Sequence, residues 1–247
     1  MPDVLGHRGK WGVLVPSTNT VVEPDFYAMA PPGITLHTGR IFVENPRMED
    51  DAGFEHLMVQ IRAAMARAVA DVVSCEPDYL IMGMSSETFW GGRKGNEEFC
   101  RRIRELSGLA IATGANACEH ALQTLGVRRL GVVTPYQPIG DRQVRAFLEE
   151  CGFEVHALKG LRCPTAVSIA HQDEGTLRAA ILEVNGPEVD AIVQVGTNLS
   201  VLRLADEAER WLGKPVLAIN AAIFWYALRQ NGIRDQMSGF GCLLRAH

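Results

Sequence analysis

The sequence predicts an α/β protein made of two similar halves, each a short parallel sheet with helices on both faces. Short apolar runs alternate with longer amphipathic runs along the 247 residues, which is typical of strands connected by helices. The strand-like runs are apolar throughout, as expected for parallel strands that are covered on both faces. The order of these runs also repeats once along the chain.

Eight apolar runs predict strands, at residues 11–16, 34–43, 78–83, 109–113, 129–134, 153–158, 190–196 and 215–219. The stretches between them predict helices near 51–75, 96–107, 117–125, 138–151, 173–186, 201–212 and 220–231. In the first of these helices, apolar residues recur every three or four positions, at Met58, Ile61, Met65, Ala68 and Val72. Such a stripe packs against a sheet.

Three pairs of segments match in the same order along the chain. They are GVLVPSTNT with GVVTPYQPI, DYLIMGMSSETF with DAIVQVGTNLSV, and GLAIATGANACEHAL with KPVLAINAAIFWYAL, at offsets of 119, 112 and 106 residues. Any chain of alternating strands and helices produces similar strands, but the shared order favours two related halves. We expect one half at 1–117 and the other at 118–247, with a return of the last helices, near 220–247, to the first half as an alternative.

Composition excludes several classes of protein. The net charge is −5 and the basic residues form no stripe, which argues against a nucleic-acid partner. No run approaches the ~18 consecutive apolar residues of a membrane span, and the first residues lack the apolar region of a signal peptide. The six cysteines form no CxxC pair and the seven histidines no metal-binding spacing. We therefore expect a cytoplasmic protein with free thiols and no metal.

Small polar residues gather directly after the predicted strands. In parallel sheets, ligands bind at the carboxyl ends of the strands, where helix N-termini converge. Each such residue is also a good helix cap, but runs of two or three at related loops exceed what capping requires. Hydroxyls, amides and free backbone N–H groups would form an uncharged site for a carboxylate in the cleft between the halves. The residues are Ser17, Thr18, Asn19, Ser85, Ser86, Thr197 and Asn198.

Tyr136 follows the fifth predicted strand, in the segment TPYQP. A tyrosine hydroxyl in such a loop can donate a hydrogen bond to a carboxylate, or to an enediolate formed next to it. Packing of the ring over the edge of the sheet is the alternative interpretation.

These loops resemble those of a known family. GVLVPSTNT resembles the opening motif of maleate cis-trans isomerases, and GMSSETFWGG, TPYQPIGDR and VGTNLSV resemble loops of arylmalonate decarboxylase. Both belong to the aspartate/glutamate racemase superfamily, and the resemblance extends from Gly12 to about Gly232. It implies an enzyme without metal or organic cofactor. It also implies that a substrate carboxylate is held by Pro16, Ser17, Asn19, Ser85, Ser86, Tyr136, Gly196, Thr197 and Asn198.

The chain departs from the family pattern at two positions. Where relatives have catalytic cysteines in these loops, the sequence has Met84 and Gly196. Neither residue can act as acid, base or nucleophile. Cys118 is the nearest thiol in the sequence, but its place at the start of a predicted helix indicates a core residue.

Two other residues are candidates to replace the thiols. Glu87 follows Ser86 in an apolar neighbourhood, where burial would raise the pKa of its carboxyl and suit it to proton exchange. An exposed carboxylate at a helix start is the alternative. His171 lies in a loop of the second half and is a candidate general acid, or else a surface histidine.

The reaction that fits this set of residues best is a decarboxylase-like lyase reaction on a small carboxylate or dicarboxylate. Ser85, Ser86, Tyr136 and Thr197 would stabilise an enediolate, and Glu87, His171 or water would supply the proton. A maleate-isomerase-like reaction is the first alternative, although addition to a double bond requires a thiolate. A protein that binds a small acid without converting it is the second. The apolar helices suggest a homo-oligomer.

Overall fold

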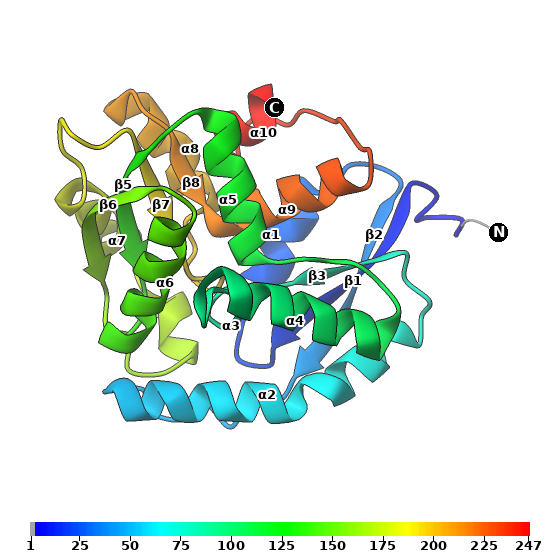
Figure 1. Cartoon of the computed structure of the whole chain (residues 1–247). Coiled ribbons are helices and arrows are strands. Elements are labelled where there is room, and N and C mark those ends of the chain that lie inside the picture. The colour runs from blue at the N-terminus through cyan, green and yellow to red at the C-terminus, as the bar shows by residue number, and fades with distance from the viewer. Residues whose placement is uncertain (1–2) are drawn as a thin grey trace.

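The described part of the chain, residues 3–247 of a computed structural model, forms eight strands in two parallel sheets (Figure 1). The first sheet has the order β2-β1-β3-β4 and the second β6-β5-β7-β8. Their strands are β1 (Gly9–Pro16), β2 (Ile34–Ile41), β3 (Tyr79–Met82), β4 (Ile111–Ala112), β5 (Arg129–Thr134), β6 (Glu154–Gly160), β7 (Ala191–Gln194) and β8 (Val216–Ala218). The α/β class and the two-sheet architecture predicted from the sequence are confirmed.

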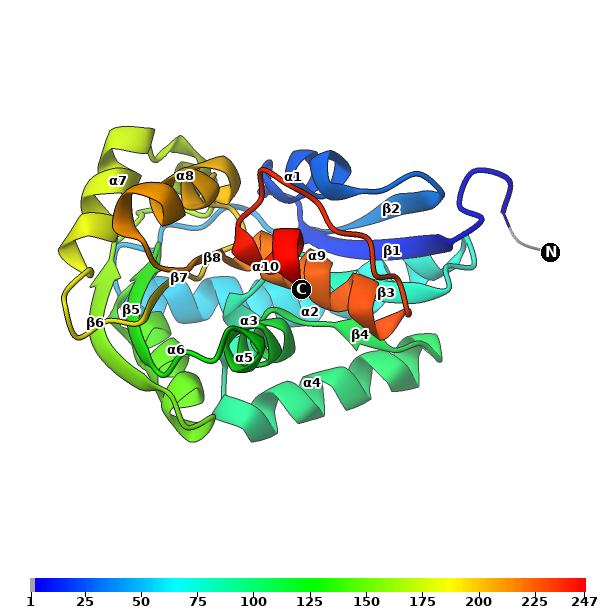
Figure 2. The ribbon, with the colours of Figure 1, turned by 90° about the horizontal axis from the view of Figure 1, so that it is seen from above.

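Helices cover both faces of each sheet. On the first sheet, α2 and α4 pack together on one face, while α1 and α9 pack together on the other. Figure 2 shows α7 and α8 on one side of the second sheet and α6 on the other. The helices are α1 (Val22–Met29), α2 (Asp51–Val73), α3 (Ser86–Phe89), α4 (Gly92–Ser107), α5 (Gly114–Leu125), α6 (Pro138–Glu150), α7 (Glu174–Glu183), α8 (Leu202–Leu212), α9 (Ile219–Gln230), α10 (Cys242–Ala246) and the 3-10 helix η1 (Val167–His171). No helix within residues 3–247 is long and apolar enough to cross a membrane.

The helix α9 follows the last strand of the second sheet but packs against α5, α1 and the strands β3 and β4 of the first sheet. Every residue from Ile219 to Leu228 is buried. The Phe224 ring lies 5.9 Å from that of Trp11 in β1 and 5.4 Å from that of Phe26 in α1, between ring centroids. A helix that is apolar on all sides is stable only when it is enclosed, and here α1, α5, β3 and β4 enclose it. The division of the chain at residue 117 remains a prediction.

The sequence did not predict α1, α3, α10 or η1. In α1, Pro24 is the third residue, a position where the missing N–H of proline breaks no helical hydrogen bond. The short helices α3, α10 and η1 are too short for an apolar period to show. Two of these elements, α1 and α3, begin next to the strand ends that form the pocket described below.

Candidate active site

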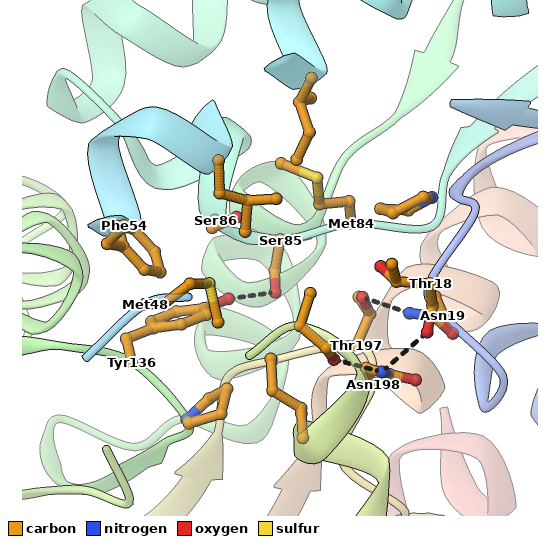
Figure 3. Close-up of a pocket in the computed structure, with 17 residues that line it drawn as sticks. Thr18, Asn19, Met48, Phe54, Met84, Ser85, Ser86, Tyr136, Thr197 and Asn198 are labelled. Atoms are coloured by element: carbon orange, nitrogen blue, oxygen red, sulfur yellow. Dashed lines mark hydrogen bonds between the residues drawn. The ribbon is translucent and has the colours of Figure 1, made fainter. Parts of the chain in front are cut away.

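A pocket lies at the carboxyl ends of β1, β3, β5 and β7, between the two sheets (Figure 3). It contains about 460 Å³ of empty space, with its open mouth included. Both halves of the chain contribute to its wall, as expected when the strand ends of two sheets face each other. The lining residues are Pro16, Thr18, Asn19, Met48, Phe54, Leu57, Ile61, Met84, Ser85, Ser86, Pro135, Tyr136, Ala166, Ile169, Gly196, Thr197 and Asn198.

Ser85 and Tyr136 form a hydrogen-bonded pair that joins the two halves within the pocket. Their hydroxyl oxygens are 2.8 Å apart, and both side chains are buried. Burial raises the pKa of the Tyr136 phenol above its ordinary value because the phenolate would be poorly solvated. The phenol therefore keeps its proton at neutral pH and can donate it in a hydrogen bond.

The backbone of Tyr136 is fixed by a polar cluster beneath it, in which Thr134 and Asp141 are buried and Arg162 is exposed. Its N–H donates to the hydroxyl of Thr134 at 3.1 Å, and its carbonyl accepts from the guanidinium of Arg162. Arg162 also pairs with Asp141 of α6, which accepts from the Thr134 hydroxyl. This cluster holds Tyr136 at the end of β5 with its ring directed into the pocket.

Thr197 follows β7 at the position that corresponds to Ser85 after β3 in the sequence repeat. Its side chain makes hydrogen bonds to the first half. The Thr197 hydroxyl donates to the carbonyl of Gly83 at 3.0 Å and accepts from Nδ2 of Asn19 at 3.2 Å. The Oδ1 atom of Asn19 accepts from the N–H groups of Val21 and Val22 at 2.9 and 3.0 Å. Asn19 therefore both caps the start of α1 and positions Thr197.

Asn198 continues this connection between the halves. Its Oδ1 atom accepts from the N–H of Thr20 at 3.0 Å, and its Nδ2 atom donates to the carbonyl of Ala166 at 2.9 Å and to that of Thr18 at 3.4 Å. Three loops thus meet at one amide side chain, as the dashed lines in Figure 3 show. At Asn19, Thr197 and Asn198 the halves are therefore joined by neutral hydrogen bonds.

One wall of the pocket is apolar and comes mainly from α2 and the loop before it. The Phe54 ring packs edge-on against Tyr136, with ring centroids 5.3 Å apart, and stacks on Trp90 at 6.2 Å. The remaining members of this wall are Met48, Leu57, Ile61, Ala166 and Ile169. A ligand here meets hydrogen-bonding groups on one side and hydrocarbon on the other.

Among the described residues that line the pocket, Tyr136 has the only ionisable side chain. Met84 and Gly196 occupy the two strand-end positions where the family resemblance implies thiols. Cys118 and Cys163 are buried elsewhere; burial raises the pKa of Cys118 well above its ordinary range and that of Cys163 to about 11. The pocket surface therefore offers neither a thiolate nor a carboxylate nor an imidazole.

The structure brings most of the residues predicted for the site into this pocket. The nine that line it are Pro16, Thr18, Asn19, Ser85, Ser86, Tyr136, Gly196, Thr197 and Asn198. They lie in loops whose strands were predicted correctly, so their convergence follows from the topology.

The structure places Ser17, Glu87 and His171 outside the pocket wall. The Ser17 hydroxyl exchanges hydrogen bonds with the backbone of Val43. The Glu87 carboxylate faces away from the pocket and accepts from Nε of Arg62 at 2.9 and 3.0 Å. His171 is exposed at the end of η1, although Ile169 of the same short helix lines the pocket. The expected apolar environment of Glu87 is thus corrected: the carboxylate has a cationic partner.

The apolar wall was not predicted from the sequence, although α2 contains a signal for it. An α-helix rises 1.5 Å per residue, so the 23 residues of α2 extend roughly 34 Å, more than its short sheet requires. Phe54 and Leu57 continue the apolar stripe toward its N-terminus, where α2 contacts α6 of the other half. An apolar stripe that extends beyond the sheet on which its helix packs indicates a second apolar contact surface, and here that surface is the wall of the pocket.

The facing parallel sheets, with a pocket at their strand ends, define an aspartate/glutamate racemase-like fold. A family model for arylmalonate decarboxylase matches residues 11–244. The chain belongs to this family, as the loop motifs in the sequence predicted.

Individual relatives fall into two groups of enzymes. The chain is similar to maleate isomerase from Pseudomonas putida, with 24% identity over 244 residues that cover 94% of this chain and 96% of the relative. It is similar to arylmalonate decarboxylase from Bordetella bronchiseptica, with 30% identity over 154 residues that cover 62% and 64% of the two chains. Its relatives are thus enzymes named for reactions of small acids.

The fold is shared with solved structures of both groups. A maleate cis-trans isomerase from Nocardia farcinica, carrying a covalently bound succinylcysteine intermediate, superposes with a TM-score of 0.86 at 24% identity and covers 96% of this chain and 98% of its own. A structure of arylmalonate decarboxylase has a TM-score of 0.75 at 23% identity, with 95% and 98% covered.

Proposed function

We propose that the protein is a decarboxylase-like lyase that acts on a small dicarboxylate with an apolar substituent. One observation carries this proposal: the pocket supplies hydrogen-bond donors for an oxyanion but, among its described lining residues, no ionisable group other than Tyr136. Among the reactions named for the relatives, decarboxylation is the one whose first step needs neither a base nor a nucleophile.

The first step uses the donors of the pocket. The bond between the α-carbon and one carboxylate breaks, CO2 leaves, and the electron pair passes into the remaining carboxylate to form an enediolate. One of the hydroxyls of Ser85 and Tyr136 donates to the other, so this pair has one O–H left to donate to the charge. The Thr197 hydroxyl also lies in the pocket wall, but it donates to the carbonyl of Gly83 and can serve the enediolate only after it leaves that bond. A single donor of this type contributes about 3–4 kcal/mol to lowering a barrier.

The apolar wall suits the carboxylate that is lost. A carboxylate held against Phe54, Leu57 and Ile61 is poorly solvated, whereas the CO2 that it becomes is neutral. Exclusion of water from this side therefore favours the transition state over the bound substrate. The same wall accommodates an apolar substituent on the α-carbon.

The α-carbon finally takes up one proton. With Glu87 and His171 outside the pocket wall, we assign this proton to the Tyr136 phenol or to a water bound to it. The phenolate that remains recovers a proton from water, and its raised pKa makes this return favourable.

Isomerisation is less well supported, although the isomerases are similar over more of the chain. The succinylcysteine in the Nocardia relative requires a thiolate next to the double bond. The described lining of this pocket contains no cysteine. Binding of a small acid without conversion is the second candidate, and the same lack of ionisable groups favours it.

Release of CO2 from phenylmalonate and from alkylmalonates tests the proposal. We expect turnover by the wild-type protein, and a fall in kcat of about 10²–10³-fold in Tyr136→Phe and in Ser85→Ala. Ser17→Ala is the matched control, because this hydroxyl lies on an adjacent loop but bonds to the backbone of Val43. Its activity should stay near that of the wild type.

The two alternatives, isomerisation and binding without conversion, each predict a different result when small acids are tested. A change in ultraviolet absorbance as maleate is converted to fumarate, without CO2 release, would show an isomerase. A rise in Tm with phenylmalonate or phenylacetate, but no turnover of any acid, would show a binding protein.

A further inference from the structure

The buried Asn220 and the half-buried Asp25 form a polar network that reaches the backbone of Thr197, and neither residue lines the pocket. Nδ2 of Asn220, at the start of α9, donates to the carbonyl of Thr197 at 3.0 Å and to Oδ2 of Asp25 in α1 at 2.8 Å. One amide group thus connects a carboxylate of the first half to a pocket loop of the second. None of the contacts described for the pocket itself involves Asp25 or Asn220.

Only one of the two polar atoms of the Asn220 side chain, Nδ2, makes hydrogen bonds. Its side chain is 2% exposed, and its Oδ1 atom has no hydrogen-bond partner among the described residues. A buried acceptor without a donor is costly. The observed orientation, with both hydrogen bonds made by Nδ2, is the one that an ionised Asp25 requires, because a carboxylate can only accept.

Protonation of Asp25 would reverse this preference. A protonated carboxyl can donate to Oδ1 of Asn220 once the amide turns over, and that bond satisfies the orphaned acceptor. The turned amide then directs Nδ2 away from the carbonyl of Thr197. The ionised form of Asp25 therefore corresponds to a Thr197 loop held by Asn220, and the protonated form to a loop without this hydrogen bond.

Few charges act on Asp25. The cationic group that lowers its pKa is Arg203 of α8, whose guanidinium donates to the carbonyl of Gly239 at 3.0 Å. Glu23, on the same turn of α1, is paired with Arg40. Because burial outweighs Arg203 and Asn220, the pKa of Asp25 is raised to about 6, so the carboxyl changes state in a range that the protein can experience.

We propose that Asp25 and Asn220 are positioning residues that hold the Thr197 loop in its acid-binding arrangement only while Asp25 is ionised. This inference rests on the proposed use of the pocket for a carboxylate ligand. It assigns the pH dependence of binding to a group outside the pocket wall.

The first test needs no ligand. In ¹⁵N–¹H spectra of the free protein, the Asn220 side-chain amide and the Thr197 backbone amide should titrate together with a midpoint near the Asp25 pKa of about 6. The titration should vanish in Asp25→Asn and persist in Glu23→Gln, which removes a neighbouring carboxylate that does not contact Asn220. Persistence of the titration in Asp25→Asn, or its absence from the wild type, would overturn the proposal even if the proposed reaction were correct.

The second test measures affinity for phenylacetate, whose carboxyl is ionised throughout the range from about pH 5.5 to 8 because carboxylic acids titrate near pH 4. The wild-type Kd should rise about three- to tenfold toward the acidic end, the equivalent of one net hydrogen bond. Asp25→Asn should abolish this pH dependence. Asn220→Ala should bind weakly at every pH, and the double variant should be no weaker than Asn220→Ala alone.

The two tests separate this proposal from the proposed function. If no variant binds phenylacetate but the amide titration depends on Asp25, the positioning network stands and the ligand class is wrong. If Asn220→Ala binds as tightly as the wild type at all pH values, the network does not position the loop.

Discussion

Gly196 shows why the loop after β7 has no reactive side chain at this position. Its φ is +130°, a backbone conformation that side-chain-bearing residues rarely adopt. A Cβ atom added there would lie 2.5 Å from Cδ and 2.7 Å from Cγ of Pro135. The ring of Pro135 cannot move aside without its backbone, so a cysteine at residue 196 requires a different loop, not merely a different side chain.

Substitution of Gly196 should therefore be costly. We expect Gly196→Ala to lower the free energy of unfolding by about 1–3 kcal/mol through backbone strain, with a further loss from the contact with Pro135. Thermal unfolding checks this, with Gly126→Ala as a control for strain alone, because Gly126 also has a positive φ, at +66°, but open space around its Cβ position. Equal losses in the two variants would contradict the role of Pro135.

Asp25 should reduce stability at neutral pH. Its pKa rises from 3.8 to about 6 on folding, because the folded protein favours the protonated carboxyl over the carboxylate. The resulting stabilisation of the folded state is complete below pH 3.8 and is lost as the pH rises through 6. A shift of this size corresponds to at most about 3 kcal/mol, and less after the partial exposure of the side chain is allowed for. We expect Asp25→Asn to unfold at a higher temperature than the wild type at pH 8, with the difference disappearing near pH 4. A difference that is the same at both pH values would contradict the raised pKa.

At the scale of the element, α1 depends on a residue that also serves the pocket. Asn19 caps this helix through Oδ1 and contacts Thr197 through Nδ2. The preference of asparagine for helix starts thus does not compete with a binding role, because the two ends of one amide perform the two tasks.

Two substitutions of Asn19 should separate these tasks. Asn19→Ala should cost about 1–2 kcal/mol of stability through loss of the cap and should also weaken binding of phenylacetate. Asn19→Asp keeps a capping oxygen but loses the donor to Thr197 and adds negative charge to the pocket, so its Tm should stay near that of the wild type while binding is lost. Melting curves with and without ligand measure both effects. Parallel losses of stability in the two variants would show that the cap is not what Asn19 contributes.

The elements differ in how far the sequence predicted them. All eight strands, together with the loops after them, were predictable because continuous apolar runs and their polar ends are local features. The orientation of the Glu87 side chain was not predictable, because it is set by Arg62 in α2, which lies 25 residues earlier in the chain. The same holds for the apolar wall: Phe54 reaches the pocket only because α2 extends across to α6. Local pattern thus predicts which loops meet, whereas packing between distant segments decides which side chains face the cavity.

At the scale of the whole molecule, the pocket exists only where the halves meet. Ser85 bonds to Tyr136, Asn19 to Thr197, and Thr20 to Asn198, and each pair joins the first half to the second. Binding of an acid should therefore stabilise the contact between the halves as well as each loop.

The chain crosses between the halves more than once, and this limits where it can be divided. Because α9 supplies the apolar cover of β3, β4 and α1, the fragment 1–125 would expose the surface that Phe224 and its neighbours now bury. We expect this fragment to lack cooperative thermal unfolding. The C-terminal segment lies near the start of the chain, where Arg8 pairs with Asp235 at 2.6 Å, so a chain that places residues 219–247 before residues 3–125 through a short linker should fold. Cooperative unfolding of the fragment 1–125 on its own, followed by near-ultraviolet circular dichroism, would show that the first sheet does not need α9.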